Sequence, residues 1–187
     1  MDHYVDIDVR PDPEFPVHQL MSALYAKLHR ALVAQGRTDI GVSFPGVEAQ
    51  APQLGTRLRL HGKLAVLSAL LDSDWLAGMR DHAVLTPPEL VPLAAQHRAV
   101  RRVQVKSSPE RLRRRLMRRQ GIDEGAAFQR IPDKAARLAH LPFVQLRSTS
   151  TGQSFRLFIH HGPLQPVAAL GGFNAYGLSL AATIPWF

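Results

Sequence analysis

Cysteine is absent from the 187 residues of this chain. Its absence excludes a disulfide framework, a cysteine nucleophile and every thiolate zinc site, and it fits a reducing compartment. Long apolar runs are also missing, since no stretch approaches the roughly 18 to 20 apolar residues that span a bilayer. The opening MDHYVDIDVR carries acids where a secretory signal carries basic residues, so we predict no export signal. We therefore expect a cytoplasmic protein with no membrane partner.

Acidic residues are few: 15 Asp and Glu stand against 23 Lys and Arg, which gives a formal net charge of +8 and a pI near 10.8. Hydrophobic residues make up 45% of the chain, enough for a folded core, so the excess charge does not belong to a disordered basic tail. A surplus of this size indicates an anionic partner. Nucleic acid is the commonest such partner, and an anionic membrane surface is the lesser alternative.

The basic residues are concentrated between His97 and Arg119. This window holds nine arginines and Lys106 against one acid, Glu110, so its surplus of nine exceeds that of the whole chain. The rest of the chain is close to neutral. The basic character therefore belongs to one local feature.

A strand followed by a helix is predicted for this window. Residues 98–106 alternate valines with polar side chains, as a half-buried strand does. Ser108 and Pro109 then form a helix start, and Gly121 follows the helix end. In a helix over about 109–120, five arginines fall on one contiguous arc of about 140°. They are Arg111, Arg114, Arg115, Arg118 and Arg119.

Several interpretations of this arginine arc are open. A solvated charged face is the usual reason for a charge run, but such helices mix signs four residues apart and this one does not. A membrane-surface helix needs a broad apolar face opposite the charges, which Arg113 interrupts. Nucleic acid fits better, because a planar guanidinium binds phosphate and the Hoogsteen edge of guanine with two hydrogen bonds. RNA and double-stranded DNA are both possible ligands.

The remaining pattern predicts an α+β fold. The first half shows a strand, a helix, two short strands, a helix and a strand, in the order βαββαβ of ferredoxin-like domains. These elements cover residues 4–10, 17–35, 40–44, 57–61, 64–79 with a possible break at 72–74, and a strand within 83–91. Prolines at positions 87, 88 and 92 place a junction near residue 95. We therefore predict a ferredoxin-like domain over 1–95 and a second, α/β domain over 96–187 that carries the arginine-rich helix.

The second domain continues after that helix. A further helix is expected at 123–139, where Pro132 threatens its continuity, followed by strands at 142–147 and 154–161. No internal repeat or low-complexity tract is present.

His29 is the candidate for catalysis. It lies at the margin of the apolar stripe of helix 17–35, where a histidine is more often a packing residue. Imidazole is nevertheless the natural proton carrier near neutral pH. RNA cleavage needs little more than a base that deprotonates a 2′-hydroxyl aligned with its own phosphate. Such a reaction needs no metal and yields a 2′,3′-cyclic phosphate.

The other histidines do not indicate a metal site. The nine histidines include no pair four residues apart on a predicted helix, and cysteine ligands are absent. We therefore predict no metal and no cofactor.

Three further positions carry a structural and a functional interpretation. The turn from Ser148 to Thr151 supplies hydroxyls for a phosphate or ribose, including that of Ser150, but it is also an ordinary β-turn sequence. Phe155 is suited either to stacking on a base pair or to the core. Tyr176 lies between glycine-bearing turns, where it either packs or hydrogen-bonds a catalytic side chain.

Long motifs along the chain resemble a known family. They are MDHY-x-D-I, PDPEFP, LMSALYAKLHRALVAQG, RVQVKSSPERLRRRLMRR, LRSTSTGQSFRLFI-x-HGPL, GGFNAYGLS and PWF. Together they are similar to the type I-F CRISPR precursor-RNA processing endoribonucleases, and the resemblance covers essentially the whole chain. It implies a ferredoxin-like N-terminal domain, a C-terminal domain with the arginine-rich helix, and cleavage at the 3′ base of the CRISPR repeat hairpin.

The resemblance also implies roles for single residues. His29 matches the general base, Ser148 the residue that holds the attacking 2′-hydroxyl, Ser150 a neighbour of the scissile phosphate, and Tyr176 the residue that orients the histidine. Arg102 and Gln104 match readers of bases at the foot of the stem, and Phe155 the aromatic residue beneath its last base pair. The groove-facing arginines match Arg114, Arg115, Arg118 and Arg119.

The sequence thus predicts a metal-independent endoribonuclease that keeps its product bound as a subunit of a type I-F surveillance complex. The alternative is a non-catalytic protein of the same fold that binds structured RNA, in which His29 only packs. The basic run ends at Gln120, where family members continue with a basic or ring-bearing residue, and this puts the outermost phosphate contact in doubt.

Overall fold

A computed structural model describes residues 1–47, 53–104, 109–131 and 141–187, without the side chains of Pro109 and Arg111. The fold is a mixed α and β structure in which all paired strands are antiparallel. The described residues form three sheets, with the strand orders β2-β3-β1-β4, β10-β6 and β7-β9-β8, and β5 pairs with the start of β1. Residues 105–106 of the predicted strand, Ser108 at the predicted helix start and residues 132–139 of the helix predicted over 123–139 lie outside the described residues. In the described part, the helix predicted over 123–139 ends at Arg130, because Ile131 before Pro132 leaves the helical backbone with φ −129° and ψ 81°.

The first half of the chain forms the largest sheet and two helices. The elements are β1 (His3–Val9), α1 (Val17–Ala34), β2 (Gly41–Ser43), β3 (Arg57–Gly62), α2 (Leu64–Asp72), β4 (Ala83–Leu85) and β5 (Glu89–Leu90). Their apolar faces meet in one core, because β1 alternates buried apolar residues and α1 presents a stripe at helical spacing. That stripe consists of Leu20, Met21, Leu24, Tyr25, Leu28 and Leu32.

The second predicted helix is shorter than the pattern indicated. It ends at Asp72, at the predicted break, because Ser73 adopts an extended backbone with φ −81° and ψ 140°. The Ser73 hydroxyl donates to the Leu70 carbonyl at 2.7 Å. Leu76 and Met79 are still buried, although they lie in turns. The apolar pattern at Leu76 and Met79 therefore identified core residues correctly, although these residues lie beyond the end of the helix.

The second half forms the two smaller sheets and the remaining helices. The elements are β6 (Gln96–Arg98), β7 (Val100–Val103), α3 (Pro109–Gln120), α4 (Glu124–Arg130), β8 (Phe143–Arg147), β9 (Ser154–His161) and β10 (Ile184–Trp186). The single strand predicted from residue 98 is divided at Ala99, whose carbonyl accepts from the Gly162 amide at 2.8 Å. Its two parts pair in different sheets, β6 with β10 and β7 with β9.

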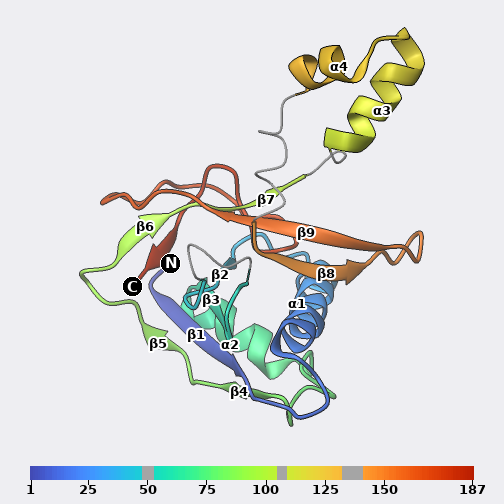
Figure 1. The fold of residues 1–187 in the computed structure, drawn as a ribbon. Coiled ribbons are helices and arrows are strands. Elements are labelled where there is room, and N and C mark those ends of the chain that lie inside the picture. Colours follow the sequence, from blue (N-terminus) through green and yellow to red (C-terminus); the bar gives the residue numbers. More distant parts are fainter. Residues whose placement is uncertain (48–52, 105–108, 132–140) are drawn as a thin grey trace.

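The two halves share one core. Buried residues from β8 and β9 belong to the same cluster as those of α1, and α1 packs against β8. Hydrogen bonds also cross between the halves: the Gln145 amide donates to the Ser22 hydroxyl, and the Val42 amide donates to the Gly177 carbonyl. By contrast, α3 and α4 pack on each other and project from the body beyond the end of β7 (Figure 1).

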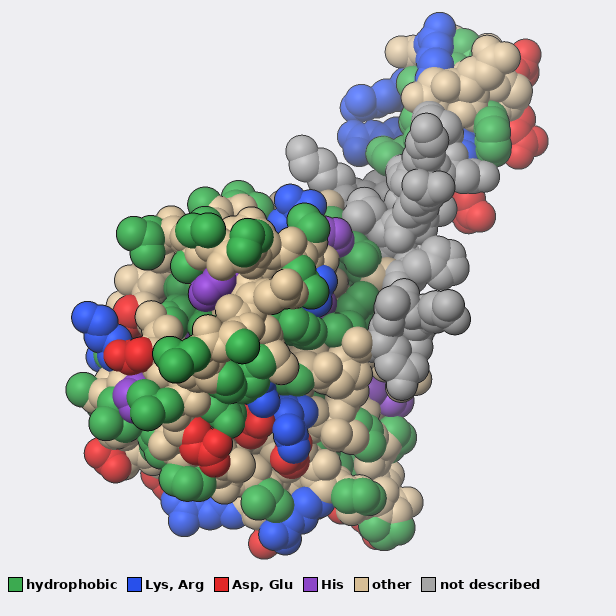
Figure 2. All heavy atoms as spheres, turned by 90° about the vertical axis from the view of Figure 1, so that its left-hand side faces the viewer, with side chains coloured by type: hydrophobic (Ala, Val, Ile, Leu, Met, Phe, Trp, Pro, Cys, Tyr) green, Lys and Arg blue, Asp and Glu red, His purple; other side chains and the backbone are tan. Residues whose placement is uncertain are grey.

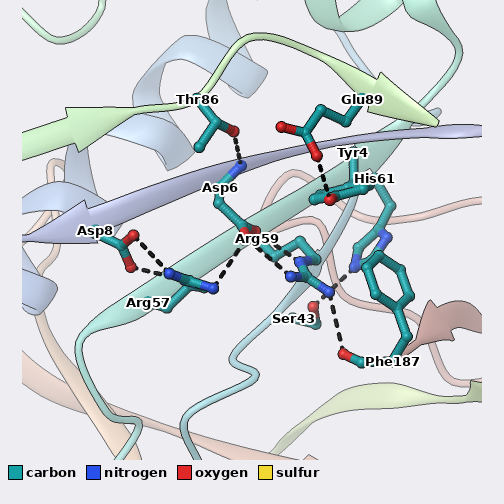
Figure 3. A network of polar contacts seen from close by, with 10 residues as sticks. All are labelled: Tyr4, Asp6, Asp8, Ser43, Arg57, Arg59, His61, Thr86, Glu89 and Phe187. Atoms are coloured by element: carbon teal, nitrogen blue, oxygen red, sulfur yellow. Dashed lines mark hydrogen bonds and ion pairs between the residues drawn. The ribbon is translucent and has the colours of Figure 1, made fainter. Parts of the chain in front are cut away.

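A buried ion pair fastens the last residue to the first sheet. Asp6 on β1 faces Arg59 on β3, and two guanidinium nitrogens donate to the carboxylate at 2.6 and 2.8 Å (Figure 3). The Arg59 guanidinium also lies over the Tyr4 and Phe187 rings, 4.5 and 4.1 Å from their centroids. It donates to Phe187 O at 3.2 Å as well. One paired arginine therefore joins β1, β3 and the end of the chain.

Two histidines are held uncharged in this interior. His61 is fully buried, and its Nε2 lies 2.8 Å from the Ser43 hydroxyl (Figure 3). Burial and then the nearby Arg59 charge lower the pKa of His61 to about 3. Half-buried His161 packs against Trp186 and Phe44, and burial followed by the Arg98 charge lowers its pKa to about 4.

We predict that the protein loses stability as the pH falls from about 6.5 to about 4. In the unfolded chain both histidines regain an ordinary pKa near 6.5, so the unfolded state binds protons that the folded state does not. Each such proton lowers the free energy of unfolding by about 1.4 kcal/mol per pH unit. Urea unfolding at several pH values across this range measures the slope.

The variant His61→Gln provides the control for this slope. Glutamine does not titrate, so the variant should show a shallower pH dependence than the wild type, whatever its stability at neutral pH. An unchanged slope would show that buried His61 does not contribute.

Candidate active site and arginine surface

His29 lies on α1 at the edge of the buried stripe and is half-buried. Its Nδ1 is 2.8 Å from the Ala175 carbonyl oxygen. A carbonyl oxygen only accepts, so in the neutral ring this contact places the proton on Nδ1 and leaves the lone pair on Nε2. The geometry therefore prepares Nε2 to take a proton.

Tyr176 contacts His29 through its ring. The two rings are stacked, with centroids 3.9 Å apart and planes 12° from parallel. The backbone of Tyr176 is fixed by Tyr25, whose buried hydroxyl donates to the Tyr176 carbonyl at 2.7 Å. Burial raises the pKa of Tyr25 well above its usual value, so this donor stays protonated.

The loop around Tyr176 is tightly constrained. Asn174 Oδ1 accepts from the Tyr176 amide at 2.8 Å, and Gly177 follows with a φ of 68°. A side chain at Gly177 would also collide with Val42 on β2. Only glycine fits this position, and the loop therefore presents Ala175 and Tyr176 to α1.

The turn between β8 and β9 carries the predicted serines. The hydroxyls of half-buried Ser148 and exposed Ser150 are 3.1 Å apart. Ser148 Oγ accepts from the Thr151 amide at 3.2 Å, and Arg147 Nε donates to the Gly152 carbonyl at 2.9 Å. The turn thus holds two hydroxyls side by side.

A pocket of about 350 Å³ brings these groups together. Its walls come from α1, from the β8–β9 hairpin and from the loop before β10. The lining residues are Ala26, His29, Arg30, Leu146, Arg147, Ser148, Thr149, Ser150, Phe155 and Tyr176. All four predicted catalytic residues and Phe155 are therefore in one site. Sequence reasoning missed Arg30 and Arg147, for which the only signal was their position next to His29 and Ser148.

A second pocket, of about 470 Å³, contains none of the predicted site residues. Its polar side chains include Asp39, Lys63 and His97, and its other walls are mainly apolar. This second pocket is the larger of the two. The smaller pocket, however, combines a histidine, hydroxyls and arginines, which are the groups expected in a reactive site.

Arg102 lies beside the site on β7. Its guanidinium carbon is 5.8 Å from the Phe155 ring centroid and 5.7 Å from that of Tyr176. Both distances are within the range of a cation–π contact. Gln104 is exposed just after β7. Neither predicted base reader lines the pocket, and Arg102 contacts two residues that do.

The predicted helix over 109–120 is confirmed as α3, and its outer face carries arginines. We call Arg114, Arg115, Arg118 and Arg119, all exposed, the arginine surface of α3. Basic side chains gather on one side of the projecting helix pair, and acidic side chains lie on its other side (Figure 2). The side chain of Arg111 is outside the described residues.

The other face of α3 docks on α4. Arg113 Nε donates to the Ile131 carbonyl at 2.9 Å, and its guanidinium lies 4.2 Å from the Phe128 ring centroid. Gln120 Oε1 accepts from Arg130 Nη1 at 2.5 Å. Gln120, which departs from the expected basic run, therefore ties the end of α3 to α4.

A family model described as "CRISPR-associated protein (Cas_Csy4)" matches residues 4–187. The chain belongs to this family. The resemblance seen in the sequence motifs is thereby confirmed.

Two relatives of this Cas_Csy4 chain are each named "CRISPR-associated endonuclease Cas6/Csy4". The protein of Pseudomonas aeruginosa (strain UCBPP-PA14) is 59% identical, and that of Escherichia coli (strain UTI89 / UPEC) is 48% identical. Both alignments span 187 residues and cover 100% of this chain and of the relative. A solved structure, "Structure A of CRISPR endoribonuclease Cse3 bound to 19 nt RNA", matches with a TM-score of 0.38 and 13% identity over 99% of this chain and 100% of that chain.

The described ranges of this family member are residues 1–47, 53–104, 109–131 and 141–187. Within them, no group of three or more histidine and carboxylate side chains is arranged to hold a metal ion. None of the helices in these ranges has the length and apolar character needed to cross a bilayer.

The contacts of His29 lead to a prediction for nitrogen and proton spectra. At alkaline pH, long-range proton–nitrogen correlations should show a protonated Nδ1 and an unprotonated Nε2, because the Ala175 carbonyl selects that tautomer. The stacked Tyr176 ring should also shift the His29 ring protons upfield.

The variants Tyr176→Phe and Tyr176→Ala distinguish the effect of the Tyr176 ring on His29 from the effect of its hydroxyl. The phenylalanine variant keeps the stacked face and should preserve the shift, whereas the alanine variant should abolish it. Loss of the shift in Tyr176→Phe would mean that the hydroxyl holds the pair together.

Proposed function

We propose that this protein is a metal-independent endoribonuclease that cleaves CRISPR repeat hairpins in precursor RNA and remains bound to its product. The observation that carries the proposal is the pocket in which His29, with its Nε2 lone pair free of the Ala175 contact, faces a site shared with two serine hydroxyls. The names of the full-length relatives support an endonuclease of CRISPR systems.

His29 acts as the general base in this mechanism. Nε2 takes the proton of the 2′-hydroxyl as the 2′ oxygen attacks the adjacent phosphorus. The bond from phosphorus to the 5′ oxygen breaks, and that oxygen leaves as a hydroxyl after it takes a proton from water. The products are a 2′,3′-cyclic phosphate and a 5′-hydroxyl end. The Nδ1 contact with Ala175 keeps the imidazole oriented throughout.

The other pocket residues position the substrate. Ser148 holds the 2′-hydroxyl, and Ser150, 3.1 Å away, lies near the scissile phosphate. Tyr176 orients His29 through the stacked ring. Alignment of the attacking oxygen with the leaving oxygen is the largest requirement of such a reaction, and a turn with two fixed hydroxyls meets it.

The hairpin stem is bound by residues on β7, β9 and α3. Phe155 stacks beneath its last base pair, while Arg102 and Gln104 read base edges at the foot of the stem. The arginine surface of α3, together with Arg111, contacts the phosphates of the groove. Regular A-form RNA has a major groove too deep and narrow for side chains, but a short hairpin opens near its ends.

The strand order supports the proposed layout. Residues 3–85 run βαββαβ with the sheet order β2-β3-β1-β4, as in a ferredoxin-like domain, and β5 adds a short strand beside β1. We assign residues 1–95 to this domain and residues 96–187 to the RNA-binding domain. We further propose that the protein works in the cytoplasm, where precursor RNA is transcribed, as a subunit of a type I-F surveillance complex.

The catalytic role of His29 is tested with the repeat hairpin encoded beside the gene. The variant His29→Ala should lower the single-turnover cleavage rate by about a hundredfold or more, because a positioned general base contributes about 10²–10⁴. The control His18→Ala removes an exposed histidine from the same helix and should cleave normally. The wild-type product should carry a cyclic phosphate.

Equal rates for His29→Ala and wild type would overturn the mechanism. Binding without any cleavage by the wild type would identify a non-catalytic RNA-binding protein instead. A chelator should leave the wild-type rate unchanged, and loss of cleavage in the chelator would refute metal independence. A hairpin with a 2′-deoxy group at the cleavage position should bind but not be cut.

The role of the arginine surface is tested by salt dependence. About six or more phosphate contacts predict that affinity falls by on the order of a thousandfold between 50 and 200 mM salt. The variant Arg118→Gln should reduce the slope of log affinity against log salt by about one. The control Arg10→Gln makes the same charge change on the body and should keep the wild-type slope. A slope unaltered by Arg118→Gln would show that the arginine surface of α3 does not contact the RNA.

A further inference from the structure

Arg30 is a cation in the pocket to which the mechanism above gives no role. It follows His29 on α1, is exposed and lines the same pocket. Arg57 and Arg59, in the body, pair with Asp8 and Asp6. The side chain of Arg30, in contrast, makes no hydrogen bond or ion pair with the described part of the chain. Its guanidinium is therefore available to a ligand in the pocket.

The pocket is suited to an anion. Among the described residues that line it there is no acid, while two arginines, Arg30 and Arg147, contribute positive charge. One donor of Arg147 is already used, because its Nε donates to the Gly152 carbonyl. This hydrogen bond stabilises the turn that carries Ser148 and Ser150. Among the described residues, Arg30 is the pocket cation whose guanidinium donors have no partner.

The proposed cleavage creates a need for such a cation. As the 2′ oxygen attacks, negative charge increases on the two non-bridging oxygens of the phosphate, and it is greatest near the transition state. Neutral His29 and the serine hydroxyls bring no permanent positive charge to these oxygens. A guanidinium is always protonated, and its planar fork matches two phosphate oxygens.

We propose that Arg30 binds the non-bridging oxygens of the scissile phosphate and stabilises the charge that develops there. The inference rests on the proposed endoribonuclease function and extends it to a residue outside the set predicted from the sequence. Because His29 and Arg30 are consecutive on one helix, the base and the cation are held by the same rigid element. The charge is therefore stabilised without reorganisation of a loop.

The test compares Arg30→Gln, Arg30→Lys and the control Arg10→Gln under single turnover, with protein in saturating excess over the repeat hairpin. Arg30→Gln should cleave about tenfold to a hundredfold more slowly than wild type, which is less than the roughly 10²–10³ lost with one enclosed donor to a developing oxyanion, because Arg30 is exposed. Arg30→Lys keeps the charge without the fork and should fall between the two rates. Arg10→Gln should cleave like wild type.

Binding measurements separate transition-state stabilisation from simple attraction. Affinity for the hairpin with a 2′-deoxy group at the cleavage position should fall by less than about threefold in Arg30→Gln, because one exposed phosphate contact contributes little to a large interface. A cleavage rate within about threefold of wild type would overturn the proposal, as would an equal slowing in Arg10→Gln.

The same assay distinguishes the two levels of inference. If wild type cleaves, His29→Ala does not, and Arg30→Gln cleaves normally, the endoribonuclease function holds and the role of Arg30 is refuted. If the wild type fails to cleave, the proposed function itself is wrong. Unchanged thermal unfolding of Arg30→Gln verifies that the exposed substitution leaves the fold intact.

Discussion

The site depends on the contact between α1 and the loop that precedes β10. Two neighbouring carbonyls of that loop accept hydrogen bonds from one face of the helix: Ala175 from His29 at 2.8 Å and Tyr176 from Tyr25 at 2.7 Å. Tyr25 is completely buried, so its bond is protected from water and anchors the loop. The same contact selects the tautomer of His29 and brings Tyr176 over its ring.

The arginines of the first sheet and those of the projecting helix pair differ in their partners. In the largest sheet of the body, Arg57 and Arg59 are paired with Asp8 and Asp6, and buried His61 stays neutral. On α3, the four residues of the arginine surface face solvent and the one acid of the helix is Glu110 in its first turn, while Arg113 packs against α4. The paired charges of the first sheet thus belong to the folded core, whereas the positive charge of the arginine surface is exposed to a ligand.

Most elements could be predicted from local pattern, and the differences have physical causes. The strand from residue 98 was predicted as one because its valines alternate throughout, but Ala99 bonds to Gly162 and turns the chain between two sheets. β10 was not predicted, since Pro185 is unfavourable in a strand. It is tolerated there because the strand is an edge of a two-stranded sheet. Contacts with residues far along the chain therefore decide where these strands divide and with which strands they pair.

The sequence by itself determined the α and β elements, the helix with its arc of arginines, and the family, because these depend on periodicity, helix-end residues and long motifs. It also marked His29, Ser148 and Tyr176 as candidates. Only the tertiary structure decided that they share one pocket, that Tyr176 meets His29 through its ring, and that the Arg30 side chain has no partner among the described residues. These facts depend on contacts between segments more than a hundred residues apart, which local pattern does not encode.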